Sequence, residues 1–192
     1  MLAETEGTRK SSEMSSGEAK ELAETYRFCP ACSHPRDHFE PVRPYRCTQC
    51  GHSTFFGPVS AVGAVVTNED GLVLLLRRAN DPGKGMLGMP GGFVDPGETA
   101  EIALRREVLE EVGLKVKSMR YLTSEPNGYV YRGVVLPVLD LFYVVEVESK
   151  QISLEDGEIT SWIWTELTDE VDRKSTRLNS SHEWISRMPS SA

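Results

Sequence analysis

The sequence predicts an α+β domain that follows a small module built around four cysteines. Three observations support this prediction. The cysteines form two Cys-x-x-Cys pairs within residues 29–50, which is a spacing typical of a compact metal-bound or disulfide-bonded unit. Short apolar runs separated by turn signals begin at residue 59, and they indicate β-strands. One acidic stretch, residues 99–112, carries apolar residues at helical spacing.

Length and charge limit the classes of protein that this chain can be. With 192 residues, the chain has room for one ordinary domain and a small module. The formal net charge of -8 argues against nucleic acid as the main partner. No apolar run approaches the roughly 20 residues needed to cross a bilayer, and residues 1–16 lack the apolar centre of a secretory signal. We therefore expect a cytoplasmic protein with no membrane partner.

The two ends of the chain do not have the pattern of folded domains. Residues 1–25 are rich in Glu, Ser, Thr and Gly, and we expect a disordered tail with at most a short helix near 18–26. Residues 172–192 resemble the translation of a synthetic sequencing-library adapter, although a genuine Ser-rich tail is the alternative. On the adapter interpretation, a final helix of the domain is missing. The predicted divisions are a tail at 1–25, the module at 26–57, the main domain at 58–171 and a non-native tail at 172–192.

The cysteine pairs predict a tetrahedral metal site. Two intervening residues allow a tight turn to aim both sulfurs of a pair at one ion, and a second such turn completes the set. Thiolate ligands in this geometry favour Zn²⁺, and the segment resembles a zinc ribbon. Four ligands leave no position for water, so the metal would be structural. The ligands would be Cys29, Cys32, Cys47 and Cys50.

Two alternatives to this zinc site stay open. The cysteines could form two disulfides or a redox dithiol, although the lack of a secretory signal disfavours disulfides. His34, His38 and His52 lie nearby and could replace a cysteine ligand, but with four cysteines present we expect them to be surface residues.

The main domain is predicted to alternate strands with one long helix. Residues 61–66 and 72–76 indicate a β-hairpin across the turn at 67–71. A loop follows, then a strand entry at 89–93. The helix spans 99–112 and ends at Gly113, a typical C-cap residue. Three further strands are expected at 115–123, 138–147 and 159–164.

Three glutamates place negative charge on one face of this helix. Glu107, Glu110 and Glu111 are spaced i, i+3 and i+4, so their carboxylates are neighbours. A solvated acidic face is the ordinary explanation for such a cluster. The alternative is a divalent cation, which would offset the repulsion and accept further carbonyl oxygens from Gly91 and Gly92.

The residues from Gly92 onward resemble the Nudix box at every defined position. Five residues separate Gly92 from Glu98, seven more follow, and the sequence then reads Arg-Glu-Val-Leu-Glu-Glu-Val-Gly-Leu over 106–114. The resemblance implies an α/β/α sandwich with a mixed sheet. It also implies metal-dependent hydrolysis of the pyrophosphate bond in a nucleoside diphosphate linked to another moiety, with release of a nucleoside monophosphate.

The resemblance implies roles for individual residues. The Mg²⁺ or Mn²⁺ ligands would be the carboxylates of Glu107, Glu110 and Glu111 and the carbonyl oxygen of Gly92, and one glutamate could also act as the base. Arg106 would orient a box glutamate, and Glu98 would be a structural acid. A further ligand is expected before the last strand, where Glu158 is preferred to the neighbouring acids Glu155 and Asp156.

A zinc ribbon before a Nudix domain resembles the NADH pyrophosphatase group. The motif of that group is matched here by Ser124 and Pro126 only, because its Trp-Pro-Phe-Pro part is absent. We predict that Asn127, Tyr129 and Tyr131 bind the nucleotide, with packing of the aromatic rings under the loop as the alternative. ADP-ribose is the broader expectation and NADH the narrower one. A non-hydrolytic nucleotide sensor, an RNA-end-processing protein that uses the ribbon, and a homodimer also stay open.

Overall fold

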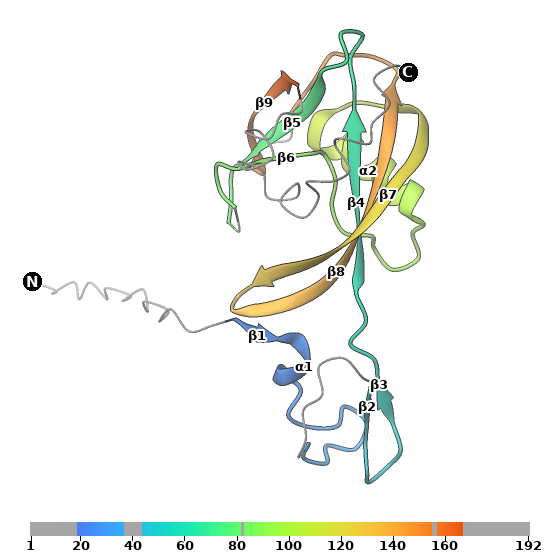
Figure 1. The fold of residues 1–192 in the computed structure, drawn as a ribbon, viewed down its shortest axis with the longest axis vertical. Helices are drawn as coiled ribbons and strands as arrows, with labels where there is room; N and C mark the ends of the chain where they lie inside the picture. The colour runs from blue at the N-terminus through green and yellow to red at the C-terminus, as the bar shows by residue number, and fades with distance from the viewer. Residues whose placement is uncertain (1–18, 37–43, 82, 155–156, 167–192) are drawn as a thin grey trace, which may run out of the picture.

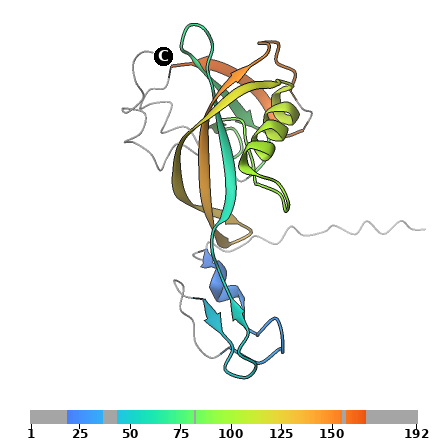
Figure 2. The same ribbon diagram turned by 90° about the vertical axis from the view of Figure 1, so that its right-hand side faces the viewer.

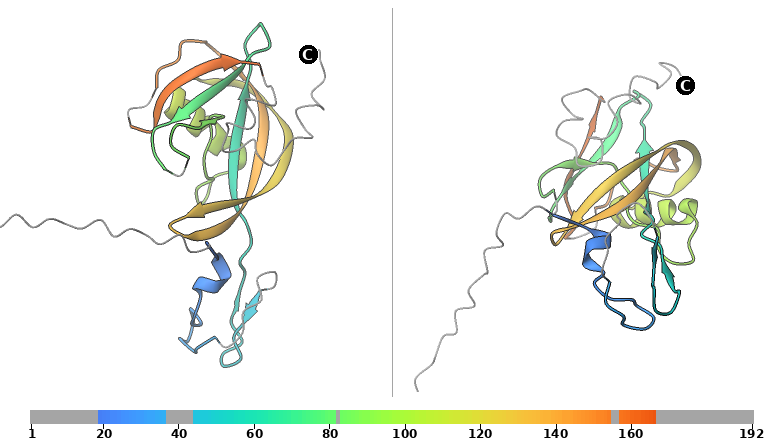
Figure 3. Two further views of the ribbon diagram at one scale, coloured as in Figure 1. Left: turned by 60° about the vertical axis from the view of Figure 1, so that its left-hand side comes forward. Right: turned by 60° about the horizontal axis from the view of Figure 1, so that its bottom comes forward.

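The computed structural model describes residues 19–36, 44–81, 83–154 and 157–166. Figure 1 shows a small module at one end of the molecule and a larger domain at the other. The module contains the short antiparallel pair β2 (Tyr45–Arg46) and β3 (Ser53–Thr54). The chain enters the larger domain directly from this module through β4 (Val59–Val66), and both views in Figure 3 place the module below the end of that strand.

The larger domain contains two sheets and one long helix. In the mixed sheet, β8 lies parallel to β4 and antiparallel to β7. The second sheet has the order β6-β5-β9 and is antiparallel. The elements are β4 (Val59–Val66), β5 (Val73–Arg78), β6 (Leu87–Gly88), α2 (Ala100–Val112), β7 (Val116–Tyr131), β8 (Val134–Val147) and β9 (Ile159–Thr165).

The main core lies where α2 meets both sheets. Figure 2 shows α2 running along one side of the mixed sheet. Its buried residues Leu104 and Val108 belong to one cluster with Val62 of β4 and Leu74 of β5. A second cluster around Leu75 and Phe142 packs the other sides of β5 and β8. The predicted α+β class with a mixed sheet is therefore confirmed.

The helix limits agree with the sequence. The Thr99 hydroxyl accepts a hydrogen bond from the Ile102 backbone N–H, which caps the first turn of α2. The helix ends at Gly113, where φ is 68° and a side chain would be strained.

The predicted hairpin of residues 61–66 and 72–76 is wrong. The turn is present, with the Asn68 side chain accepting backbone hydrogen bonds from Asp70 and Leu72. Beyond one isolated bridge between Thr67 and Val73, however, the two strands enter different sheets. Both strands are buried on both faces, so their continuous apolar pattern cannot indicate which strand is the partner.

The antiparallel pair β7–β8 is longer than the sequence predicts. β7 continues past residue 123, where the predicted strand ends, through the stretch from Ser124 to Tyr131. The tip is a two-residue turn at Arg132 and Gly133, both with positive φ, which suits a tight hairpin.

Residues 20–25 are folded rather than disordered, and their helix lies in the 18–26 range that the sequence allowed. β1 (Lys20–Glu21) pairs with the start of β8, and α1 (Leu22–Thr25) follows at once. Ala23 is buried, and its carbonyl accepts a 2.7 Å hydrogen bond from Arg36 of the module. The low apolar content of residues 1–25 did not predict these contacts, because they are made with residues far along the chain. The predictions for residues 1–18 and 167–192, including the non-native tail, lie outside the described residues.

Candidate active site and metal centre

A glycine loop joins the mixed sheet to the acidic helix. The backbone N–H groups of Val62 and Ala64 in β4 donate to the carbonyls of Gly92 and Pro90, each at 2.8 Å. Gly91 has φ of 144°, and a Cβ there would lie 2.1 Å from the Val62 carbonyl oxygen. Only glycine fits this approach, so the loop is fixed against the edge of β4.

Gly92 leaves room for a carboxylate against the backbone. A Cβ at Gly92 would lie 2.2 Å from Oε1 of Glu107, so any larger residue would displace that side chain. The Gly92 carbonyl, predicted as a metal ligand, already accepts one hydrogen bond from Val62. A carbonyl oxygen has two lone pairs, so the Gly92 oxygen can still bind a cation through its second lone pair.

Arg106 is the centre of a charge network on α2. Its guanidinium donates to both carboxylate oxygens of Glu98 at 2.9 Å, to Glu107 at 2.8 Å and to Glu110 at 3.2 Å. It also donates to the Phe93 carbonyl at 3.1 Å, which ties the helix to the glycine loop. These carboxylates raise the pKa of Arg106, and the Arg106 hydrogen bonds lower the pKa of Glu98. The pairing with Arg106 therefore keeps Glu98 ionised.

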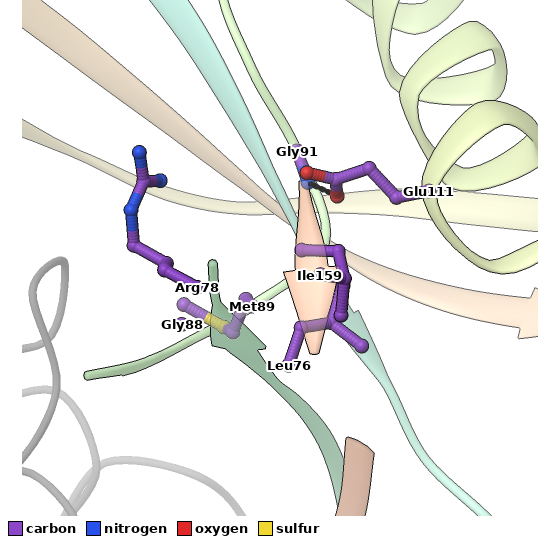
Figure 4. A pocket seen from close by; sticks show the side chains of 7 residues that line it. All are labelled: Leu76, Arg78, Gly88, Met89, Gly91, Glu111 and Ile159. Atoms are coloured by element: carbon purple, nitrogen blue, oxygen red, sulfur yellow. Dashed lines mark hydrogen bonds between the residues drawn. The ribbon is translucent and has the colours of Figure 1, made fainter. Parts of the chain in front are cut away.

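Glu111 lies on the other side of the loop and faces a pocket. Its Oε2 accepts a 2.8 Å hydrogen bond from the Gly91 N–H. Figure 4 shows this contact beside the side chains of Leu76 and Ile159. Glu158 immediately precedes Ile159 and is exposed, while Glu155 and Asp156 lie outside the described residues. The full pocket lining is Leu76, Arg78, Gly88, Met89, Gly91, Glu111 and Ile159.

The four cysteines form a compact cluster in the module. The sulfurs of Cys29 and Cys50 are 3.7 Å apart, as are those of Cys32 and Cys47, and all four lie within 4.8 Å of one another. A tetrahedron with Zn–S bonds near 2.3 Å has edges of about 3.8 Å, whereas a disulfide needs about 2.05 Å. The cluster is consistent with a zinc ribbon, and all four thiols are free.

The thiols of this cluster are electrostatically unequal. A backbone hydrogen bond from Cys50 is the largest of the effects that lower the pKa of Cys47 to about 6. A backbone hydrogen bond from His34 favours a lower pKa for Cys32. The neighbouring thiols and burial have the opposite effect and together raise the pKa of Cys32 to about 12. No histidine of the described chain belongs to the cluster. His52 is exposed, as expected of a surface residue, whereas His34 is half-buried and His38 lies outside the described residues.

Comparison with known proteins identifies the family. The family model described as NUDIX domain matches residues 57–186, more than half of the chain. The chain belongs to the Nudix family. The matched range overlaps the segment from 172 onward that the sequence predicts to be non-native, and that prediction stays a prediction.

Several curated relatives of this Nudix protein are named NAD-capped RNA hydrolase NudC. The protein from Haemophilus influenzae strain PittGG is 31% identical over 150 residues, which cover 77% of this chain and 54% of the relative. The protein from Salmonella paratyphi C is 30% identical over 158 residues, with 80% and 58% covered. The chain thus spans little more than half the length of the curated relatives it matches.

Solved structures support the Nudix fold. The MutT NUDIX hydrolase from Burkholderia pseudomallei has a TM-score of 0.52 at 24% identity, covering 65% of this chain and 98% of that one. The NUDIX domain of Shewanella oneidensis NrtR complexed with ADP ribose has a TM-score of 0.51 at 24% identity, covering 61% and 78%. At this identity, the likeness concerns the fold alone.

Within the residues described, no helix is long and apolar enough to span a membrane.

The Nudix glutamates suit a hard divalent cation, but they are not gathered around one point. Among the residues described, only the cysteines place three or more candidate ligand atoms within 4.8 Å of one another. Arg106 holds Glu107 and Glu110, while the Gly91 N–H holds Glu111. Carboxylate and carbonyl oxygens are the ligands that Mg²⁺ and Mn²⁺ prefer, so the donor set fits.

The three residues predicted to bind the nucleotide all lie on β7, but their contacts differ. Tyr129 packs edge-to-face on Phe93, with ring centroids 5.5 Å apart, and so borders the glycine loop. Asn127 donates from Nδ2 to Asp140 at 2.9 Å. Tyr131 is 47% exposed at the tip of the hairpin. Sequence reasoning missed Phe93 and Asp140, although an acid within the apolar run 138–147 was a visible signal.

We expect the Glu98–Arg106 pair to contribute stability that is lost in acid. Because Arg106 lowers the pKa of folded Glu98 below its ordinary value of about 4.3, the contribution is present above that value and disappears as pH falls through the folded pKa. Glu98→Gln should lower the melting temperature at pH 7, and the difference from the unmodified protein should shrink toward pH 3. Thermal unfolding across this range measures the effect. Glu146→Gln, which breaks an exposed 3.7 Å pair with Lys117, should show little change.

Proposed function

We propose that the chain is a metal-dependent pyrophosphohydrolase acting on a nucleoside diphosphate linked to another moiety. Water would attack phosphorus, the anhydride P–O bond would break, and a nucleoside monophosphate would be released. The observation that carries the proposal is the placement of three helix carboxylates around Arg106 and the Gly91 N–H, with Glu111 lining a pocket.

The side chains of this site would have two roles, binding the metal ion and orienting its ligands. Glu107, Glu110 and Glu111, with the Gly92 carbonyl and Glu158, would hold Mg²⁺ or Mn²⁺. When bound, the cation would neutralise diphosphate charge and make a bound water more acidic. Arg106 would orient Glu107 and Glu110 through hydrogen bonds, and Glu98 would fix Arg106 through its paired 2.9 Å hydrogen bonds. The structural metal of the cysteine cluster would be Zn²⁺.

For the substrate, we propose an adenosine-containing dinucleotide of the NAD type. The support is the name NAD-capped RNA hydrolase carried by relatives about 30% identical. ADP-ribose is the main competitor, because the chain lacks most of the motif of the NADH pyrophosphatase group. Asn127, Tyr129 and Tyr131 would contact the nucleotide. A homodimer and a cytoplasmic location stay predictions.

Product analysis tests the proposal. The purified protein is incubated with ADP-ribose, NADH, NAD, FAD or a nucleoside triphosphate, each with Mg²⁺ and with Mn²⁺, and products are followed by ³¹P NMR and chromatography. We expect AMP from NADH or NAD. AMP from ADP-ribose alone would reject the NAD-type substrate and retain the reaction. Tight nucleotide binding without any product would favour the non-hydrolytic sensor.

A further inference from the structure

Asp140 is the one buried charged side chain in the part of the chain that the structure describes. It is 4% exposed, on β8. Side chains of a strand alternate between faces, so Asp140 shares its face with the apolar Val138 and Phe142. Its Cα partners on the two adjacent strands are Ala61 in β4 and the half-buried Glu125 in β7. A carboxylate in such surroundings is costly unless hydrogen bonds satisfy it, so its retention needs a reason.

Asp140 fixes the orientation of a neighbouring amide. Asn127 on β7 donates from Nδ2 to Oδ2 of Asp140 at 2.9 Å. An ionised carboxylate only accepts hydrogen bonds, so the amide nitrogen, not the amide oxygen, must face Asp140. The Oδ1 atom of Asn127 is consequently directed away from the carboxylate. The half-buried Asn127 therefore presents an acceptor of defined position.

This acceptor lies on the same sheet face as the aromatic pair beside the Nudix box. Tyr129 is two residues beyond Asn127 on β7, so both side chains share a face. The Tyr129 ring contacts Phe93, whose backbone bridges to Ala61 of β4 and accepts from Arg106. The Tyr129 ring and the Asn127 acceptor thus lie on the face that borders the glycine loop, and Arg106 contacts that loop through Phe93.

We propose that Asp140 is a specificity-determining positioning residue that makes Asn127 an obligate acceptor for the amino group of a nucleobase. Adenine donates from its exocyclic amine, while hypoxanthine has a carbonyl oxygen at the same position and would place two acceptors against each other. The site therefore selects adenine nucleotides over hypoxanthine nucleotides. This inference rests on the proposed function for the location of the substrate, but it concerns only the base.

Paired ligands that differ in this one group test the inference. Binding of AMP and IMP is measured by calorimetry, and kcat and KM are measured for NAD and its hypoxanthine analogue. The unmodified protein should prefer the adenine ligand by about tenfold or more, because the poor partner leaves a polar group unpaired. The preference should appear in KM, with kcat little changed. Equal affinity for AMP and IMP, or a preference for IMP, would overturn the inference.

Variants separate orientation from simple structural support. In Asp140→Asn, the new amide can donate or accept, so the Asn127 amide can rotate by 180°. The ratio of the affinities for AMP and IMP should then fall toward one. The exchanged pair Asn127→Asp with Asp140→Asn again directs an acceptor outward, and the preference should return. Val130→Ala changes the opposite face of β7 and should leave the ratio intact.

The outcomes distinguish this inference from the proposed function. A protein that hydrolyses nothing but binds AMP over IMP would reject the hydrolase and keep the role of Asp140. Folding of each variant is verified by its melting temperature and circular dichroism. A folded Asp140→Asn protein that keeps the full preference rejects the inference, and so does an exchanged pair that folds but does not recover it.

Discussion

Glu111→Gln is expected to lower kcat by about 10²–10⁴-fold, the range for loss of a general base or of a ligand to a catalytic cation. The side chain is held by a 2.8 Å hydrogen bond from the Gly91 N–H and faces the pocket. A glutamine oxygen can accept the same hydrogen bond, so the loop geometry should survive while the negative charge is lost. Rates of AMP release under saturating Mg²⁺, with the melting temperature of each protein, measure this separation of charge from structure.

Glu101→Gln is the matched control for this result. Glu101 lies on the same helix, but its carboxylate accepts from the Tyr143 hydroxyl at 3.3 Å, away from the glycine loop. The glutamine side chain of this variant can still accept the bond. Turnover should stay within about twofold of the unmodified protein, because Glu101 is not one of the defined positions of the box. Equal losses in the two variants would show that a general change in α2, not the chemistry of Glu111, limits the rate.

The local parts of this fold were predictable because their causes are local. The cap at Thr99, the αL residue Gly113 and the apolar spacing of α2 each involve residues within one helix. Likewise, each Cys-x-x-Cys pair fixes its own turn, and the two pairs then meet as predicted. Such features follow from backbone geometry and short spacings, which the sequence displays directly.

The pairing of strands was not predictable on the same basis. Val62 and Leu75 have equivalent apolar neighbours in the sequence, yet β4 pairs with β8 and β5 with β9, far along the chain. The choice depends on which faces α2 covers, a tertiary property that no single segment encodes. The position of Asn127 against Asp140 is of the same kind, because it requires the register of the β7–β8 pair.

The Nudix box combines features that the local sequence predicts with features that depend on tertiary contacts. Spacing alone placed Glu107, Glu110 and Glu111 on one helix face, and the structure has them there. Spacing did not indicate that Arg106 would bind Glu107 and Glu110 while Glu111 turned to the Gly91 N–H. Those choices arise from the loop that β4 holds against the helix. A motif can therefore name the participants of a site without fixing which of them interact.

Removal of the metal is expected to unfold the cysteine module and leave the larger domain folded. Apart from the sulfurs, the described part of the module has little to hold it together, because β2 and β3 contribute two residues each and Cys29 and Cys47 are its buried apolar positions. Binding of structural Zn²⁺ supplies about 10–16 kcal/mol in small zinc modules, which here would be most of the folding free energy. The larger domain has its own core around Leu104 and Val108.

Hydrogen exchange followed by residue measures this prediction directly. Metal analysis should first find one Zn²⁺ per chain. After chelation, the Cys29 and Cys47 amides should lose protection, because their acceptors are the His34 and His52 carbonyls of the same module. Amides of α2 should keep theirs.

Variants of the module identify the ligands. Cys32→Ser removes one sulfur ligand and should reproduce the effect of chelation. His52→Ala should retain the metal, because the cluster consists of sulfur atoms alone. A chelated protein with all module amides still protected would show that packing of Tyr26 on Phe56 and of Arg36 on Tyr45, not the metal, holds the module together.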